Sequence, residues 1–368
     1  MSMHFDPPAF ATKIPVIQLA GFLWFIIVAC STNDTAQSEG LLDPEPPGEE
    51  ADSLFLNPIL DPGPDPWVFQ TGEYYFLTFT TGNNITLYRT QQMSDLGRAL
   101  KRVTWTPPST GPNSQNLWAP EIHRVQGKWY VYYAADDGNN ANHRMFVLEN
   151  ENEDPTVGPW TDKGELKLPG DRWAIDGTIF EHRGQLYYLW SGWEGSTNIR
   201  QDIYICKMSD PLTPTGERVL LTKPVLPWET NGVTPTVTEG PQVLKNGNKL
   251  FIVYSAGGCW TDGYALGMLS AQEDADLMDP GSWKKSPQPV FAQNPAGNAF
   301  GPGHNGFFKS ADGSEDWIIY HANAFAGQGC GNDRSIRIQP FFWKEDGTPD
   351  FGQPHPLFKK LTKPSGEY

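Results

Sequence analysis

A short aromatic-rich run recurs five times along this chain, and this repetition constrains the fold more than any other feature. A turn containing glycine precedes each copy, and the centres of successive copies are 55 to 66 residues apart. That spacing accommodates four short strands with their loops, which is the repeating unit of a β-propeller. The five runs begin at Glu73, Lys128, Gln185, Lys249 and Asp316.

The composition agrees with strands and turns and excludes several functions. The chain has 14 Trp, 13 Tyr and 20 Phe beside 37 Gly and 33 Pro, which disfavours an all-α fold. Its net charge of −16 would repel nucleic acid and anionic lipid headgroups, so we expect no nucleic-acid partner. We predict an all-β, five-bladed β-propeller over residues 54–368. A β-sandwich or two stacked β-domains is the alternative.

The N-terminus has the features of an export signal. Residues 14–29 are apolar, follow Lys13, and end in Ile-Val-Ala before Cys30. This ending resembles the bacterial lipobox, in which the cysteine is acylated. We therefore predict a lipoprotein signal peptide over residues 1–29 and an extracytoplasmic protein anchored through Cys30 to a bacterial membrane. An uncleaved anchor or a plainly secreted protein remains open.

Residues 30–53 form the second N-terminal segment. They carry seven acidic side chains, several Pro and Gly, and no Lys or Arg. Such a segment is typical of a solvated, flexible tether.

The residue that begins the first strand of each repeat is a candidate functional residue. In a propeller these strands line the central axis, so the five positions would meet at one mouth of the channel. Crowded carboxyl groups cannot all ionise freely, so at least one should have a raised pKa. A protonated carboxyl beside a carboxylate is what glycoside hydrolysis requires. The five residues are Asp65, Glu121, Asp176, Glu239 and His304.

Tryptophans near this ring could present flat apolar faces to a sugar. We expect most of them to belong to the core between blades instead. The candidates are Trp67, Trp118, Trp173, Trp190, Trp193 and Trp260.

Three of these acidic positions lie in motifs that resemble glycoside hydrolase family 43, and the similarity runs from about residue 57 to 353. Asn57-Pro and then Asp65-Pro resemble the opening motif, Asp176-Gly the second, and Glu239-Gly-Pro the third. The resemblance implies a five-bladed propeller and an inverting hydrolase. It implies that Asp65 is the general base, Glu239 the general acid, and Asp176 the residue that orients the acid and raises its pKa. Asp61 is the alternative base, but it lies further from the strand.

The resemblance also implies roles for residues outside this triad. It implies an axial His304 near a calcium ion, although the chemistry itself needs no cofactor and a lone histidine can equally be a hydrogen-bonded core residue. It implies that Arg337 lies near the sugar; an exposed strand charge is the alternative. Trp118 and Glu121 are candidate substrate contacts.

The longer motifs around Trp118 and His304 resemble those of exo-acting α-L-arabinofuranosidases. The resemblance implies release of terminal arabinofuranosyl residues from arabinan or arabino-oligosaccharides. A β-xylosidase or an endo-arabinanase of the same family, and a propeller that binds glycans without cleaving them, stay open. The related fructosidase-type clan is disfavoured because its Asn-Asp-Pro-Asn and Glu-Cys motifs are absent from this sequence.

Three cysteines follow the anchor candidate. Cys259 and Cys330 lie in loops after aromatic runs, where an extracytoplasmic disulfide could form, but the sequence does not give their separation. Cys206 lies in an apolar strand, so we expect a buried free thiol.

Overall fold

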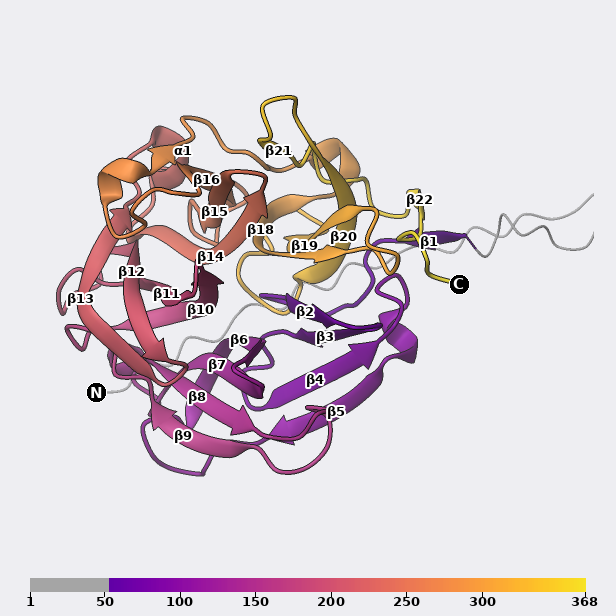
Figure 1. Cartoon of the computed structure of the whole chain (residues 1–368). Helices are drawn as coiled ribbons and strands as arrows, with labels where there is room; N and C mark the ends of the chain where they lie inside the picture. Colours follow the sequence, from indigo (N-terminus) through magenta and orange to yellow (C-terminus); the bar gives the residue numbers. More distant parts are fainter. Residues whose placement is uncertain (1–52) are drawn as a thin grey trace, which may run out of the picture. The chain divides into compact units, whose positions relative to one another are not determined.

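Short antiparallel strands make up nearly all of the fold, as Figure 1 shows for residues 53–368, the part of the chain that this computed structural model describes. The all-β expectation is confirmed. The expectations for the leader and for Cys30 concern residues before this range, and so does the expectation for the tether up to residue 52. Within residues 53–368, no helix is both long enough and apolar enough to cross a bilayer.

Each repeat folds as an antiparallel meander of four strands. The meanders are, in chain order, β2 (Trp67–Thr71), β3 (Tyr74–Thr78), β4 (Ile85–Thr90), β5 (Leu100–Trp105); β6 (Gln115–Val125), β7 (Lys128–Asp136), β8 (Arg144–Asn150), β9 (Thr161–Glu165); β10 (Ala174–His182), β11 (Gln185–Gly192), β12 (Arg200–Asp210), β13 (Thr213–Thr222); β14 (Thr236–Asn246), β15 (Lys249–Ala256), β16 (Ala265–Gln272), β17 (Lys284–Lys285); and β18 (Phe300–Lys309), β19 (Asp316–Asn323), β20 (Ser335–Trp343), β21 (Pro349–Asp350).

The remaining elements are short. A two-residue parallel contact between β12 and β14 joins the third and fourth meanders into one sheet. The helical turns and the terminal strands are η1 (Leu96–Arg98), η2 (Asn140–Asn142), α1 (Pro227–Thr230), η3 (Pro280–Ser282), η4 (Pro295–Gly297), β1 (Leu54–Leu56) and β22 (Lys360–Thr362).

The aromatic runs become the second strands of the meanders, and they form the core. Trp129, Trp190 and Trp317 are each only 1% exposed. The buried apolar side chains form five clusters, and each cluster is shared by two neighbouring meanders, including the fifth and the first. Burial between sheets, at about 25 cal/mol per Å² of apolar surface, therefore stabilises the contact of every meander with its neighbours.

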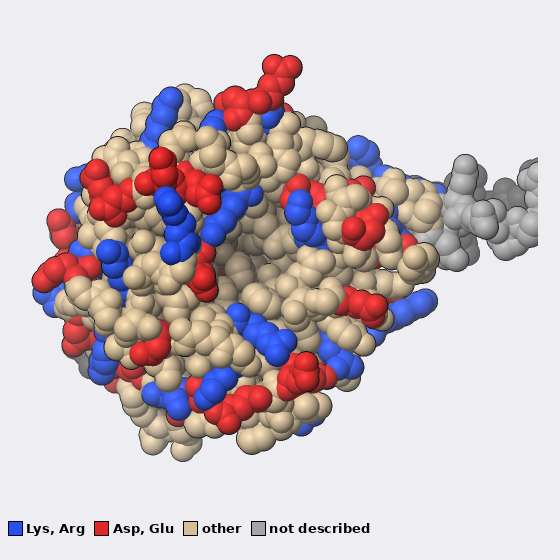
Figure 2. Space-filling view, viewed as in Figure 1, with Lys and Arg blue, Asp and Glu red and all other residues tan. Residues whose placement is uncertain are grey.

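The meanders follow one another around a central space (Figure 1). Their first strands contact one another in chain order, and β18 also contacts β2. The face shown in Figure 2 is hollowed at its centre, and acidic and basic side chains are interspersed over it.

The beginning and the end of the described chain are held together. β1 pairs with β22, and the buried Asn57 side chain accepts a hydrogen bond from the Ile338 N–H at 3.0 Å and donates one to the Ile338 carbonyl at 2.8 Å. The asparagine of the opening motif thus ties the segment before β2 to β20 of the last meander.

Near the start of the first strand of each meander, one residue has a left-handed backbone conformation, with a positive φ; we call these the left-handed residues. Register shifts interrupt the ladders of β6, β10, β14 and β18 close to these positions. A β-bulge of this kind re-aims a side chain, and a left-handed backbone costs a non-glycine residue about 1–3 kcal/mol, which the surrounding structure must supply. The five residues have φ between 41° and 56° and are Asp65, Ala119, Asp176, Gly240 and His304.

Candidate active site

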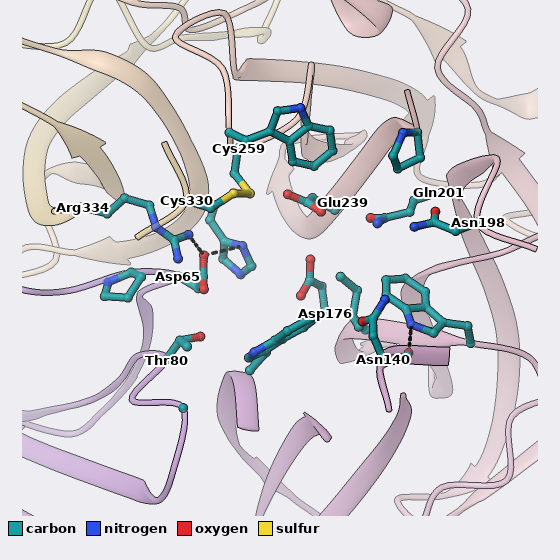
Figure 3. Close-up of a pocket in the computed structure, with 18 of the residues that line it drawn as sticks. Asp65, Thr80, Asn140, Asp176, Asn198, Gln201, Glu239, Cys259, Cys330 and Arg334 are labelled. Carbon is teal, nitrogen blue, oxygen red and sulfur yellow. Dashed lines mark hydrogen bonds and ion pairs between the residues drawn. A yellow bond between two sulfur atoms is a disulfide. The ribbon is translucent and has the colours of Figure 1, made fainter. Parts of the chain in front are cut away.

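A pocket of about 670 Å³, a size suited to a small ligand, is lined by three of these left-handed residues, Asp65, Asp176 and His304. Figure 3 shows side chains from several meanders pointing into it. Five of the seven expected site residues line this pocket: Asp65, Trp118, Asp176, Glu239 and His304.

Asp65 is held as a carboxylate. Its Oδ1 atom lies 2.6 Å from the Arg334 guanidinium, and its backbone N–H donates to His321 Nδ1 at 3.0 Å. Burial by itself would raise the pKa of Asp65, but Arg334 and then His304 and His321 lower it, and the net pKa lies well below the usual range. Asp65 is therefore charged and can accept a proton.

The environments of Asp176 and Glu239 favour protonation. Burial is the largest cause and raises the pKa of Asp176 well above its ordinary value, and the nearby Glu239 and Asp65 raise it further. Burial also raises the pKa of Glu239 to about 7, although a hydrogen bond from the Tyr264 hydroxyl at 2.7 Å opposes this rise. Asp176 Oδ2 accepts the Gly240 N–H at 3.0 Å, so it holds the backbone next to Glu239. One carboxylate and two groups that retain protons near neutrality thus share one pocket.

Three of the six candidate tryptophans line the pocket, namely Trp118, Trp173 and Trp260. Trp118 stacks on His143 with ring centroids 4.0 Å apart, and the Trp173 indole N–H donates to the Asn140 carbonyl at 2.7 Å. These contacts fix two flat faces beside the carboxyl groups. The other three, Trp67, Trp190 and Trp193, do not line the pocket, as expected for core residues.

Glu121 lies elsewhere than expected. It is buried, accepts Gln242 Nε2 at 2.5 Å, pairs with His123 at 2.9 Å, and does not line the pocket. The physical reason is the bulge in β6. The left-handed residue there is Ala119, so Glu121 lies two residues further along the strand.

Arg337 also lies away from the pocket, and it is not an exposed strand charge. It is fully buried, and its guanidinium donates to the carbonyls of Asn298, Ala322 and Asn323. The arginine that does line the pocket is Arg334, which precedes β20 and which the sequence reasoning missed. The sequence signal that could have indicated Arg334 is its place in the loop between Cys330 and β20.

His304 lines the pocket, but its surroundings do not fit a metal ion. Its backbone N–H donates to Ser255 Oγ at 2.8 Å, and burial lowers its pKa, so the ring is neutral. Residues 53–368 contain no group of three or more His, Cys, Asp or Glu side chains arranged to hold a metal. The nearby carboxylate, Asp65, already pairs with Arg334.

Cys259 and Cys330 form a disulfide with Cα atoms 5.1 Å apart. It joins the loop after β15 to the loop after β19, and both cysteines line the pocket (Figure 3). Cys206 is a buried free thiol, as expected.

The comparisons with known proteins agree with this geometry. Residues 55–349 match the profile of the Glycosyl hydrolases family 43. An "Extracellular exo-alpha-(1->5)-L-arabinofuranosidase" of Streptomyces avermitilis is 38% identical over 309 residues, which is 82% of this chain and 63% of that protein. Its namesake from Streptomyces chartreusis is 38% identical over 276 residues, covering 74% of this chain and 83% of its own length.

A solved structure is also similar. The crystal structure of α-L-arabinofuranosidase from Lactobacillus brevis has a TM-score of 0.78 and 37% identity, and the match covers 83% of this chain and 98% of that one. This chain spans less than two thirds of the length of the Streptomyces avermitilis relative. The expected resemblance to glycoside hydrolase family 43 is confirmed, and this chain belongs to that family.

Proposed function

We propose that this protein is an exo-acting, inverting α-L-arabinofuranosidase that releases terminal arabinofuranosyl residues from arabinan or arabino-oligosaccharides. The observation that carries this proposal is the meeting of Asp65, Asp176 and Glu239 in one pocket, where Asp65 is charged and Glu239 has a pKa of about 7. The printed names of the relatives, exo-arabinofuranosidases at 38% identity, support the substrate.

In the proposed reaction, protonated Glu239 donates its proton to the glycosidic oxygen, which leaves as the alcohol. Asp65 takes a proton from a water molecule, and the resulting oxygen forms the new bond to the anomeric carbon on the opposite face of the sugar. Asp176 accepts the Gly240 N–H and so holds the backbone next to Glu239. Burial and the charge on Asp65 keep the pKa of Glu239 high. Trp118 is the proposed sugar platform. We leave Glu121 and Arg337 out of the substrate contacts because neither lines the pocket.

The alternatives have less support. The endo-arabinosidase relative from Aspergillus flavus is 27% identical over 53% of this chain, below the exo-acting relatives. A glycan-binding protein without activity has no need for carboxyl groups with separated pKa values. Hydrolysis of a panel of aryl glycosides and linear arabino-oligosaccharides, with product analysis, tests the sugar, the linkage and exo or endo action together.

We further propose that the five meanders are the blades of a five-bladed propeller forming one catalytic domain over residues 54–368. The contact of β18 with β2 and the core cluster shared by the fifth and first meanders support a closed circle. We also propose that the protein is exported and anchored through Cys30. The lipobox-like sequence, the disulfide and the "Extracellular" names of two relatives support export.

A further inference from the structure

We propose that Tyr264 is a positioning residue that fixes the carboxyl group of Glu239 for proton donation and links it, through His321, to Asp65. This inference rests on the proposed function, since it assigns how the acid and the base are held relative to each other.

The first contact in this link is the hydrogen bond between the Tyr264 hydroxyl and Glu239 Oε1, at 2.7 Å. Tyr264 is 1% exposed and Glu239 8% exposed, so water competes little for this bond. Within residues 53–368, Tyr264 is the hydrogen-bond partner found for the Glu239 carboxyl group. A carboxyl group held by one buried donor keeps one orientation of its two oxygens, which leaves the other oxygen to carry the proton toward the pocket.

The backbone of β18 makes room for the tyrosine ring. A Cβ atom at Gly303 would lie 2.1 Å from Tyr264 Cε1, which is far inside contact distance. Position 303 therefore has to be glycine if Tyr264 is to keep this place. Gly303 thus leaves space for the Tyr264 ring, whose hydroxyl holds Glu239.

The second contact is a stack between Tyr264 and His321, with centroids 5.8 Å apart and planes within 8°. His321 Nδ1 accepts the Asp65 backbone N–H at 3.0 Å, which requires that this nitrogen be unprotonated. Burial, together with Arg334, lowers the pKa of His321 well below its ordinary value and so keeps the ring neutral. A buried chain of contacts thus runs from Glu239 through Tyr264 and His321 to Asp65.

Tyr264 also affects the acidity of Glu239. A hydroxyl that donates to a carboxylate stabilises the charged form and lowers the pKa, whereas burial and Asp65 raise it. Removal of the hydroxyl should therefore raise the pKa of Glu239 and make it a weaker acid. The titratable and charged groups that act on Glu239, or on the carboxyl groups of Asp65 and Asp176 beside it, are Asp65 before β2, Glu121 in β6, Asp176 in β10, Tyr264 before β16, His304 in β18, His321 in β19 and Arg334 before β20.

The test compares Tyr264→Phe with Tyr254→Phe in the full-length protein. Tyr254 is a matched control because its buried hydroxyl donates to Glu229 Oε1 at 2.8 Å and neither residue lines the pocket. We expect Tyr264→Phe to lower kcat on a substrate with a poor leaving group about 10-fold or more, and to move the basic limb of the kcat/KM profile up by about one pH unit. Tyr254→Phe should change neither quantity.

A comparison of substrates with good and poor leaving groups distinguishes a loss of acid positioning from a general loss of structure in Tyr264→Phe. A dinitrophenyl arabinofuranoside needs little help from an acid, so Tyr264→Phe should cleave it at nearly the wild-type rate. Equal losses on both substrates, or a pH profile equal to that of Tyr254→Phe, would overturn the inference. If Tyr264→Phe does not fold, Gly303→Ala, which displaces the ring and keeps the hydroxyl, must show the same leaving-group dependence. A wild-type protein with no activity on any arabinofuranoside would refute the proposed function itself.

Discussion

The guanidinium of Arg334 lies 2.6 Å from the Asp65 carboxylate, and both side chains line the same pocket. Arg334 also donates from Nε to the Gly331 carbonyl at 3.1 Å, next to the disulfide at Cys330. The charge on Asp65 therefore depends on a loop that follows β19, in the last of the meanders.

The first prediction concerns this ion pair. In Arg334→Gln the positive charge that lowers the pKa of Asp65 is lost, so this pKa rises and Asp65 is protonated at a higher pH. Because the base must be charged, the acidic limb of the kcat/KM profile should move to higher pH. Arg89→Gln, which breaks an ion pair with Asp154 away from the pocket, is the control and should leave the profile unchanged. An unmoved acidic limb in Arg334→Gln would argue against Asp65 as the base.

The second prediction concerns the acid and the base directly. Asp65→Asn and Glu239→Gln keep the shape of each side chain and remove its ability to transfer a proton. We expect each variant to lower kcat by about two or more orders of magnitude with an unaltered circular dichroism spectrum. Activity close to that of the wild type in either variant would show that the role is wrongly assigned.

The third prediction concerns the sugar platform. Trp118→Ala removes a face that is fixed by stacking on His143, and aromatic stacking is worth about 0.5–1.5 kcal/mol. KM for the arabinofuranoside should therefore rise by about 2- to 13-fold, whereas Trp118→Phe, which keeps a flat ring, should retain most of the affinity. If Phe and Ala raise KM equally, stacking is not what Trp118 contributes.

The fourth prediction concerns the disulfide. Cys259 and Cys330 are 71 residues apart in the sequence, and closing a loop of that size stabilises a protein by about 4 kcal/mol in the chain-entropy description. The double variant Cys259→Ser, Cys330→Ser should unfold at lower denaturant concentration than the wild type. Reductant should lower the midpoint of the wild type and leave that of the double variant unchanged. A reductant effect of equal size in both proteins would show that the Cys259–Cys330 bond is not the source of the stabilisation.

The fifth prediction concerns the N-terminus. If Cys30 is acylated, the protein expressed in a bacterial host should incorporate labelled fatty acid and fractionate with membranes. Cys30→Ala should abolish the label. Labelling that persists in Cys30→Ala, or a wild-type protein found only in the soluble fraction, contradicts the lipid anchor.

Much of the fold could be predicted because aromatic runs and turn glycines are local signals. Asp65, Asp176 and Glu239 were placed together because each begins the first strand of a repeat, and the structure puts all of them in one pocket. The repeat positions gave five candidates, and the resemblance to family 43 motifs singled out these three.

The remaining errors have separate physical causes. The bulges shift the strand register by amounts that the sequence does not show, so counting from the turn chose Glu121 although Ala119 holds the left-handed position. Arg337 lies on one face of β20, and its guanidinium donates to backbone carbonyls instead of facing the pocket. Glu239 in β14 and Tyr264 just before β16 are 25 residues apart in the sequence, so no local sequence pattern predicts their contact.

The stereochemistry of the first-formed product tests the proposed pair of roles most directly. Proton NMR during hydrolysis of an aryl α-L-arabinofuranoside reports which anomer of arabinose appears before the anomers equilibrate. With Asp65 activating water and Glu239 protonating the leaving oxygen, the β-anomer should appear first. Appearance of the α-anomer first would require a covalent intermediate and would contradict this assignment.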